Sequence, residues 1–167
     1  MEVEAQSSYK NVWRLLNLPL LYSSTRDIMY LLIHNKLPVR ERLHRAGLVN
    51  DPFCLCCLIP SVSDTEHYFC SCTKVSSVWN LVKQKLVQLS GENLTNFALI
   101  NLTFSKCSRE KEMVWLLGHY ISTVWDEIYV KGGDRLQCDK FFGYLSFKYK
   151  ADQQGARHRL NPIPDLQ

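Results

Sequence analysis

Three cysteines and one histidine in the middle of the chain constrain its fold more than any other feature of the sequence. They are Cys54, Cys57, His67 and Cys72, and their spacing is C-x2-C-x9-H-x4-C. Three thiolates and one imidazole make a complete tetrahedral ligand set for zinc, which binds both kinds of ligand readily. A complete set leaves no coordination position for water or substrate. The sequence therefore predicts one structural zinc ion, Zn2+, and no metal-catalysed chemistry.

Two further cysteines in the same stretch compete for this site. Cys56 would form C-x-C with Cys54, and Cys70 would form H-x2-C with His67. The spacing alone leaves these alternatives open. Cys107 and Cys138 lie outside the stretch, and we interpret both as small apolar residues.

The distribution of the cysteines argues against a secreted disulfide framework. Their number, seven, is odd, and five of them lie between residues 54 and 72. The first ten residues, MEVEAQSSYK, lack the apolar stretch of a signal peptide. We therefore expect reduced thiols and bound metal in an intracellular compartment, the nucleus or the cytoplasm. Apolar runs such as LPLLY are far too short to span a bilayer, so we expect no membrane partner.

Apolar residues recur at helical spacing and predict a mainly α fold. An apolar content of 46% is enough for a packed core. The expected helices begin near Ser24, at Pro38, at Ser71 and after Ser108, and glycines or Asn35 end them. We expect a small helical domain organised around the Cys3His knuckle, followed by a long helix and a basic aromatic tail. The expected segments are a lead-in (1–22), the zinc-binding domain (23–90), a linker with the long helix (91–133) and a partly flexible tail (134–167).

Basic side chains gather on and around the second predicted helix. They are Lys36, Arg40, Arg42, His44 and Arg45. The plain interpretation is a solvated helix face, which Glu41 makes less basic. We favour phosphate contacts to RNA or DNA from Lys36 and the three arginines, because zinc knuckles often lie beside such patches. The net charge of +4 is not by itself sufficient to indicate a polyanionic partner.

Aromatic and basic residues alternate in the tail segment FFGYLSFKYK. This composition is typical of a surface on which single-stranded nucleic acid stacks. An amphipathic element that docks on the helical core is the favoured interpretation. Lys148 and Lys150 are kept as candidate nucleic-acid-binding residues.

The order of these features resembles the zinc-binding domain at the C-terminal end of non-LTR (LINE-type) retrotransposon reverse transcriptases. The residues that carry the resemblance are Leu37-Pro38, Arg42-Leu43, Arg45, Gly47, Cys54, Cys57, Glu66-His67, Cys72 and Val78-Trp79. Val39 departs from the family pattern, in which threonine is common at this position. The resemblance covers about residues 24–85.

The resemblance implies both the ligand set and a function. It favours Cys57 and Cys72 over Cys56 and Cys70 as ligands. It also implies that the chain is part of a reverse transcriptase polyprotein, or of a host gene derived from one. The module would bind RNA or DNA during target-primed reverse transcription, with the remainder of the polyprotein as a possible partner.

The sequence lacks the carboxylate sets that polymerase or RNase H chemistry needs, so we expect no enzyme activity. The alternative function is a zinc-stabilised helical scaffold for protein interactions that binds no nucleic acid. Glu66 has two interpretations, as a residue that orients a metal ligand and as a solvated acid.

Overall fold

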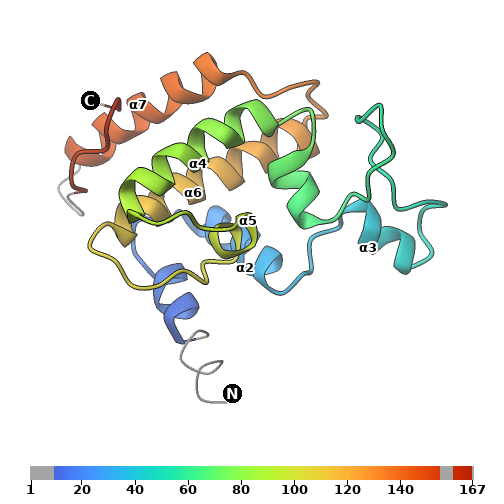
Figure 1. Ribbon diagram of the computed structural model, residues 1–167, viewed down its shortest axis with the longest axis horizontal. Coiled ribbons are helices and arrows are strands. Elements are labelled where there is room, and N and C mark those ends of the chain that lie inside the picture. Colours follow the sequence, from blue (N-terminus) through green and yellow to red (C-terminus); the bar gives the residue numbers. More distant parts are fainter. Residues whose placement is uncertain (1–9, 155–159, 167) are drawn as a thin grey trace.

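Helices make up the fold, which confirms the predicted fold class. The computed structural model describes residues 10–154 and 160–166, and no strand occurs in these ranges. Part of the expected lead-in and of the expected flexible tail lies outside the described residues. After a helical segment over 10–16, the elements are α2 (Ser23–Ile33), α3 (Arg40–Arg45), η1 (His67–Ser71), α4 (Ser76–Ser90), α5 (Asn96–Ile100), α6 (Glu110–Val124), η2 (Trp125–Val130) and α7 (Cys138–Gln154) (Figure 1). Within the described ranges, no helix is both long and apolar enough to cross a membrane.

The long helix α6 forms the centre of the core. Every residue from Glu112 to Ile121 is buried. A helix that is buried all round must be covered on every side. Helices α2 and α4 both pack on α6, and α7 also contacts α4. In Figure 1, α4 and α6 run side by side between α7 and α2.

Tyr120 of α6 contacts both α4 and the segment that carries the second half of the Cys/His motif. The rings of Trp79 and Tyr120 lie 5.2 Å apart. The buried hydroxyl of Tyr120 donates a hydrogen bond of 2.5 Å to the carbonyl of Phe69 in η1. A buried hydrogen bond of this kind fixes the position of both elements, because breaking it leaves polar groups unpaired. The hydrogen bond from Tyr120 therefore fixes η1 against α6.

The aromatic segment of the tail forms the helix α7. It docks on the core, as the sequence predicted for an amphipathic element. Phe141, Leu145 and Tyr149 are spaced four residues apart and are all buried. The indole of Trp115 donates a hydrogen bond of 2.8 Å to Asp152. Beyond α7, the three apolar residues Leu160, Ile163 and Leu166 are buried as well.

The ends of several helices differ from the prediction. Ser24 does not cap α2, which is preceded by Tyr22 and has no side-chain cap, and Ser108 does not cap α6. Helix α3 begins at Arg40 and not at Pro38, because the buried side chains of Leu37 and Val39 hold the preceding segment extended. The third predicted helix begins at Ser76.

Gly47 follows the end of α3, as predicted. Its φ angle is +71°, which glycine adopts without strain. The amide of Leu48 donates to the carbonyl of Leu43, and the amide of Gly47 donates to the carbonyl of His44. These two bonds form the Schellman motif that commonly ends a helix.

Gly118 of α6 lies close to Leu21 and Thr25 at the start of α2 and generates a stability prediction. A Cβ atom at this position would lie 2.4 Å from Leu21 Cδ2 and 3.2 Å from Thr25 Cγ2. Alanine normally stabilises a helix relative to glycine by about 1 kcal/mol, but overpacking costs about 1–3 kcal/mol. We expect Gly118→Ala to lower the free energy of unfolding by about 1 kcal/mol. Gly143→Ala in α7 is the matched control, because nothing lies within 4 Å of its Cβ position. Urea denaturation of both variants should give changes of opposite sign.

His119 makes the stability of the fold depend on pH. Burial lowers the pKa of His119 to about 4, although Asp152 raises it and Lys148 lowers it further. Below about pH 6.5 the imidazole of His119 is protonated in the unfolded chain but stays neutral in the folded chain. The free energy of unfolding therefore falls as the pH drops towards 4. Between pH 7 and pH 5 we expect the wild type to lose about 2 kcal/mol more than His119→Gln in urea denaturation.

The exposed His34 provides the control for this experiment. His34→Gln should lose stability with pH as the wild type does. Loss of metal at low pH affects all three proteins and cancels in the differences. Equal pH dependence of the wild type and His119→Gln would contradict the prediction.

Candidate metal centre

A short hairpin carries the first two cysteines of the motif. Phe53 and Val62 form an isolated antiparallel bridge. The amide of Cys54 donates to the carbonyl of Ser61 at 2.8 Å, and the amide of Ser63 donates to the carbonyl of Pro52 at 2.9 Å. The C-x2-C turn lies within this hairpin, which projects from the helical body beside α3 (Figure 1). The hairpin thereby directs two thiols back towards η1.

The π-helical turn η1 provides the other two residues of the motif. The amide of Cys72 donates to the carbonyl of His67 at 2.8 Å, five residues earlier. This i to i+5 hydrogen bond defines a π turn, and such turns are frequent at functional sites. It brings His67 and Cys72 to the same side of the turn, which accounts for the x4 spacing. Asp64 stabilises the start of the turn, because its carboxylate accepts a 2.7 Å hydrogen bond from the amide of His67.

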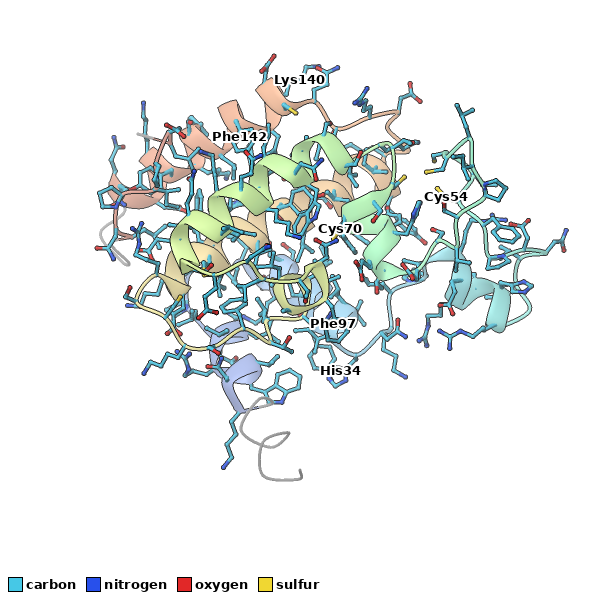
Figure 2. The ribbon with its side chains drawn as sticks, in the orientation of Figure 1. His34, Cys54, Cys70, Phe97, Lys140 and Phe142 are labelled. Carbon is cyan, nitrogen blue, oxygen red and sulfur yellow. The ribbon has the colours of Figure 1, made fainter. Side chains whose placement is uncertain are left out.

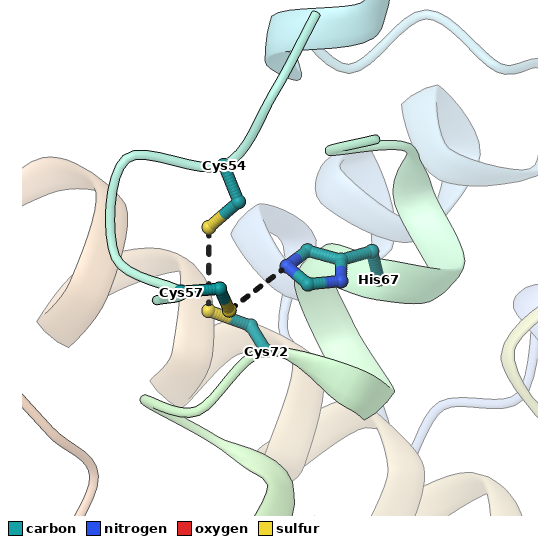
Figure 3. Close-up of side chains that lie close together, drawn as sticks. All are labelled: Cys54, Cys57, His67 and Cys72. Carbon is teal, nitrogen blue, oxygen red and sulfur yellow. Dashed lines mark hydrogen bonds between the residues drawn. The ribbon is translucent and has the colours of Figure 1, made fainter. Parts of the chain in front are cut away.

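The four side chains converge with distances that suit a tetrahedral zinc ion. Their ligand atoms all lie within 4.8 Å of one another. The Sγ atoms of Cys54 and Cys72 are 3.8 Å apart, and Cys57 Sγ is 3.5 Å from His67 Nε2 (Figure 3). With Zn–S and Zn–N bonds of about 2.3 and 2.0 Å, tetrahedral geometry requires separations of about 3.8 and 3.5 Å. These two separations match a tetrahedral zinc site, and all the ligand atoms lie close enough together to share one ion.

Backbone amides and a hydroxyl stabilise negative charge on the sulfur atoms. The amide of Cys56 lies 3.4 Å from Cys54 Sγ, and the Thr73 hydroxyl lies 3.7 Å from Cys57 Sγ. Burial raises the pKa of Cys57, but hydrogen bonds with the backbone and side chain of Thr73 and with Cys54 and Cys72 together outweigh it, so the net shift is downward. These donors suit thiolate ligands, because a donor to the charged form favours ionisation.

Burial determines the net pKa shift of each of the other three ligands. It raises the pKa of Cys54 and raises the pKa of Cys72 to about 12. It lowers the pKa of His67, although Asp64 opposes the shift, so the imidazole is kept neutral as a metal ligand must be. A metal ion would supply the positive charge that stabilises the buried sulfur atoms as thiolates.

The remaining cysteines lie outside the cluster. Cys70 is buried in the core, and Figure 2 shows it within the helical body while Cys54 lies on the hairpin. Burial raises the pKa of the Cys70 thiol well above its ordinary value. Cys56 is exposed, and Cys107 donates to the sulfur of Met113 at 3.6 Å. The structure thus brings together the set of cysteines that the resemblance favoured.

The sequence predicted only some of the residues that surround the four ligands. Glu66 accepts a hydrogen bond from Asn96 in α5 at 3.2 Å, and no hydrogen bond between Glu66 and a ligand is found in the described residues. Asp64 and Thr73 contact the site and were not predicted. The spacing of Asp64, three residues before His67, is typical of a helix N-cap and could have indicated its role. Thr73 gives no comparable signal.

The predicted cationic residues of α3 lie beside the hairpin, and their guanidinium groups contact other parts of the chain. Arg40 pairs with Asp51 at 3.1 Å, and Arg45 pairs with Glu41 at 2.8 Å. Arg42 donates to the carbonyl of Asn35. Lys36 is exposed at the turn before α3.

Lys148 and Lys150 lie elsewhere, on α7. Figure 1 places α7 and α3 on opposite sides of the helical body. The ammonium group of Lys148 lies 5.4 Å from the ring of Tyr22 and 5.7 Å from that of Tyr144. Lys150 is exposed. The six predicted nucleic-acid-binding residues thus form two separate sets.

Comparison with known proteins supports the identity of the Cys/His motif. Residues 3–79 match the family described as zinc-binding in reverse transcriptase, which confirms the resemblance stated from the sequence. That family is a zinc-binding domain and not the catalytic polymerase domain. Neither the curated proteins nor the solved structures give a significant match. The family match and the Cys3His cluster together suggest zinc as the metal.

Metal analysis would test the ligand set. We expect the purified, reduced protein to contain one zinc ion per chain and Cys72→Ser to lose it, because three remaining ligands hold zinc far more weakly. Cys56→Ser is the matched control, since its thiol lies outside the cluster and it should retain the ion. Elemental analysis by mass spectrometry after dialysis measures the content. Retention of zinc by Cys72→Ser would show that another residue completes the site.

Proposed function

We propose that the chain is a non-catalytic zinc-binding module of a retrotransposon-type reverse transcriptase, or of a host gene derived from one. In this role it binds RNA or DNA and supports target-primed reverse transcription. The observation that carries the proposal is the convergence of the four ligand atoms within 4.8 Å in a segment that matches the zinc-binding family. The remainder of the polyprotein is the proposed covalent partner.

One zinc ion in this site would be structural. Cys54, Cys57, His67 and Cys72 would hold it and fill all four tetrahedral positions, which leaves none for substrate. The ion would clamp the hairpin to η1, and η1 is itself fixed to α6 through Tyr120 and Phe69. The clamp keeps the hairpin and the adjacent α3 in one orientation relative to the core. This rigidity is what a binding surface gains from the metal.

Phosphate binding by α3 is compatible with the ion pairs that its arginines make. Arg40 and Asp51 form a partly exposed pair, as do Arg45 and Glu41. Exposed pairs of this kind contribute only about 0–1 kcal/mol, so a phosphate can replace the carboxylate at little cost. Lys36 and Arg42 lie at the same end of the segment and extend the basic surface. We propose that these four residues contact the nucleic-acid backbone.

Helix α7 is proposed as a second, weaker contact surface. Lys148 lies between the rings of Tyr22 and Tyr144, which are 50% and 38% exposed. Two exposed tyrosines with an ammonium group close to both rings offer stacking and charge to a single strand. Lys150 adds a second exposed cation on the same helix.

The alternative function is a zinc-stabilised protein-interaction scaffold without nucleic-acid binding. The observation that favours it is the group of exposed apolar side chains on the hairpin, which includes Leu55, Leu58 and Ile59. A protein complex whose affinity does not change with salt, together with no measurable RNA or DNA binding, would support it.

Salt-dependent binding tests the phosphate contacts. We expect the variant Arg40→Gln/Arg42→Gln/Arg45→Gln to bind a labelled single-stranded RNA about tenfold or more weakly than the wild type. The slope of log K against log salt should fall by about 2, since each lost contact to a single strand removes about 0.7. Fluorescence anisotropy over a series of salt concentrations measures both quantities. DNA of the same sequence, measured in parallel, reports the preference between the two nucleic acids.

Two further variants complete this experiment. Lys148→Gln/Lys150→Gln should show a smaller loss, while Lys111→Gln, an exposed cation at the start of α6, should bind as the wild type does. Unchanged affinity and slope in the triple arginine variant would reject the role of α3.

A further inference from the structure

A cavity at the start of α7 lies apart from the metal centre. It has a volume of about 420 Å³ and lies between the end of α6, η2, the loop over 131–137 and the first turn of α7. It shares no residue with the Cys/His cluster or with α3. Figure 2 shows Lys140, which lines it, away from Cys54 on the hairpin. Cavities that hold small organic ligands have volumes of about 300–1,000 Å³, so this one is large enough for such a ligand.

Apolar and aromatic side chains form part of the cavity wall. Leu136 and Phe141 are buried, and Ile128 is half-buried. Tyr144 lines the cavity as well and is 38% exposed. Its ring lies 5.7 Å from the ammonium group of Lys148, in the proposed stacking surface of α7. The cavity therefore adjoins the surface that is proposed to contact a single strand.

The loop that forms one side of the cavity is fixed to the rest of the chain. The ammonium group of Lys74 donates to the carbonyl of Gly133, and the amide of Leu136 donates to the carbonyl of Lys74, both at 2.8 Å. The amide of Gly133 donates to the carbonyl of Glu127 at 2.9 Å, and a Cβ atom at this glycine would lie 2.5 Å from the same oxygen. These contacts form the wall before a ligand arrives, so little ordering is needed when the ligand binds.

Two cations and two carboxylates line the cavity. Arg135 of the loop and Lys140 of α7 form no ion pair within the described residues. Asp126 of η2 forms none in that part of the chain either. Glu127, the second carboxylate, pairs with Lys131 at 2.5 Å. A ligand in the cavity therefore meets positive charge from the loop and α7, and a carboxylate from η2.

These groups match the two ends of a nucleotide. Arginine and lysine bind phosphate, and arginine can do so through two parallel hydrogen bonds. A carboxylate only accepts hydrogen bonds, so Asp126 requires a base that donates them. Guanine has two neighbouring donors on its Watson–Crick edge, the ring N–H and the amino group, and one carboxylate can accept from both. Uracil has one donor between two carbonyl oxygens, which a carboxylate repels.

We propose that this cavity binds one guanine nucleotide of the RNA or DNA strand. Arg135 and Lys140 contact its phosphate, and Asp126 accepts hydrogen bonds from its base. Tyr144 lies where the strand continues onto the α7 surface. The proposal rests on the nucleic-acid-binding function proposed above and adds a base preference, which phosphate contacts alone do not provide.

Titration of the full-length, isotope-labelled protein with guanosine monophosphate, followed by nuclear magnetic resonance, tests the cavity. We expect the amide signals of Arg135, Lys140 and Tyr144 to shift. Uridine monophosphate should bind about fivefold or more weakly, because it lacks the paired donors. Arg135→Gln/Lys140→Gln should bind guanosine monophosphate about tenfold or more weakly than the wild type. Lys111→Gln, an exposed cation outside the cavity, is the matched control and should bind it as the wild type does.

Asp126→Asn tests the group that selects the base. An asparagine amide both donates and accepts, so this variant should bind the two nucleotides within about twofold of each other. Asp139→Asn changes an exposed acid of α7 outside the cavity and should keep the wild-type preference. In the strand, a uridine oligomer with one guanosine should bind the wild type more tightly than the same oligomer without it. Asp126→Asn should bind both oligomers equally.

Three results would overturn the proposal. These are signal shifts away from the cavity or none at all, equal binding of guanosine monophosphate to the wild type and Arg135→Gln/Lys140→Gln, or a guanosine preference that Asp126→Asn retains. The α3 arginine variant separates this outcome from that of the proposed function. RNA binding that depends on α3, with no guanosine monophosphate in the cavity, would uphold the function and reject the cavity. Guanosine monophosphate in the cavity of a chain that binds neither RNA nor DNA would reject the function and assign the cavity to a free guanine nucleotide.

Discussion

The i to i+5 hydrogen bond between His67 and Cys72 is the constraint on which the rest of the metal centre depends. It creates the π turn that places an imidazole and a thiol on one side of η1. The opposite side of the same turn carries the buried Phe69 and Cys70, which belong to the core. One short turn therefore faces the metal site on one side and the helical body on the other. The hydrogen bond from Tyr120 to Phe69 connects the two.

The helical body and the metal-bearing hairpin rest on different stabilising forces. The body is held by apolar burial around α6, whose middle residues are all buried. The hairpin contributes few buried apolar side chains and exposes several, so backbone hydrogen bonds hold it, and a metal ion in the Cys/His cluster would add to its order. The family match ends at Trp79, yet Trp79 packs on Tyr120 of α6, beyond the matched residues. The matched segment thus completes its core with residues that follow it in the chain.

The surface around the hairpin separates charge from apolar area. The arginines of α3 lie beside a hairpin that has no charged residue, and the lysines of α7 lie on the far side of the body. The proposed phosphate contacts and the exposed apolar side chains therefore lie on neighbouring segments of the chain. A rigid link through the metal centre would keep the two surfaces in a fixed relation.

The sequence by itself determined the helical class and the end of α3 at Gly47, because each depends on local spacing or on one residue's backbone preference. It located the Cys/His segment as well, but spacing alone left Cys56 and Cys70 as competing ligands. Only the tertiary structure decided where the helices begin, since Ser24 lies inside α2 and Ser108 lies before Arg109, the residue that precedes α6. It also excluded Cys70 from the ligand cluster by turning its side chain into the core. The sequence also could not predict that the cationic residues divide into two separate surfaces. The relative placement of α3 and α7 depends on long-range packing around α6, which no local pattern encodes.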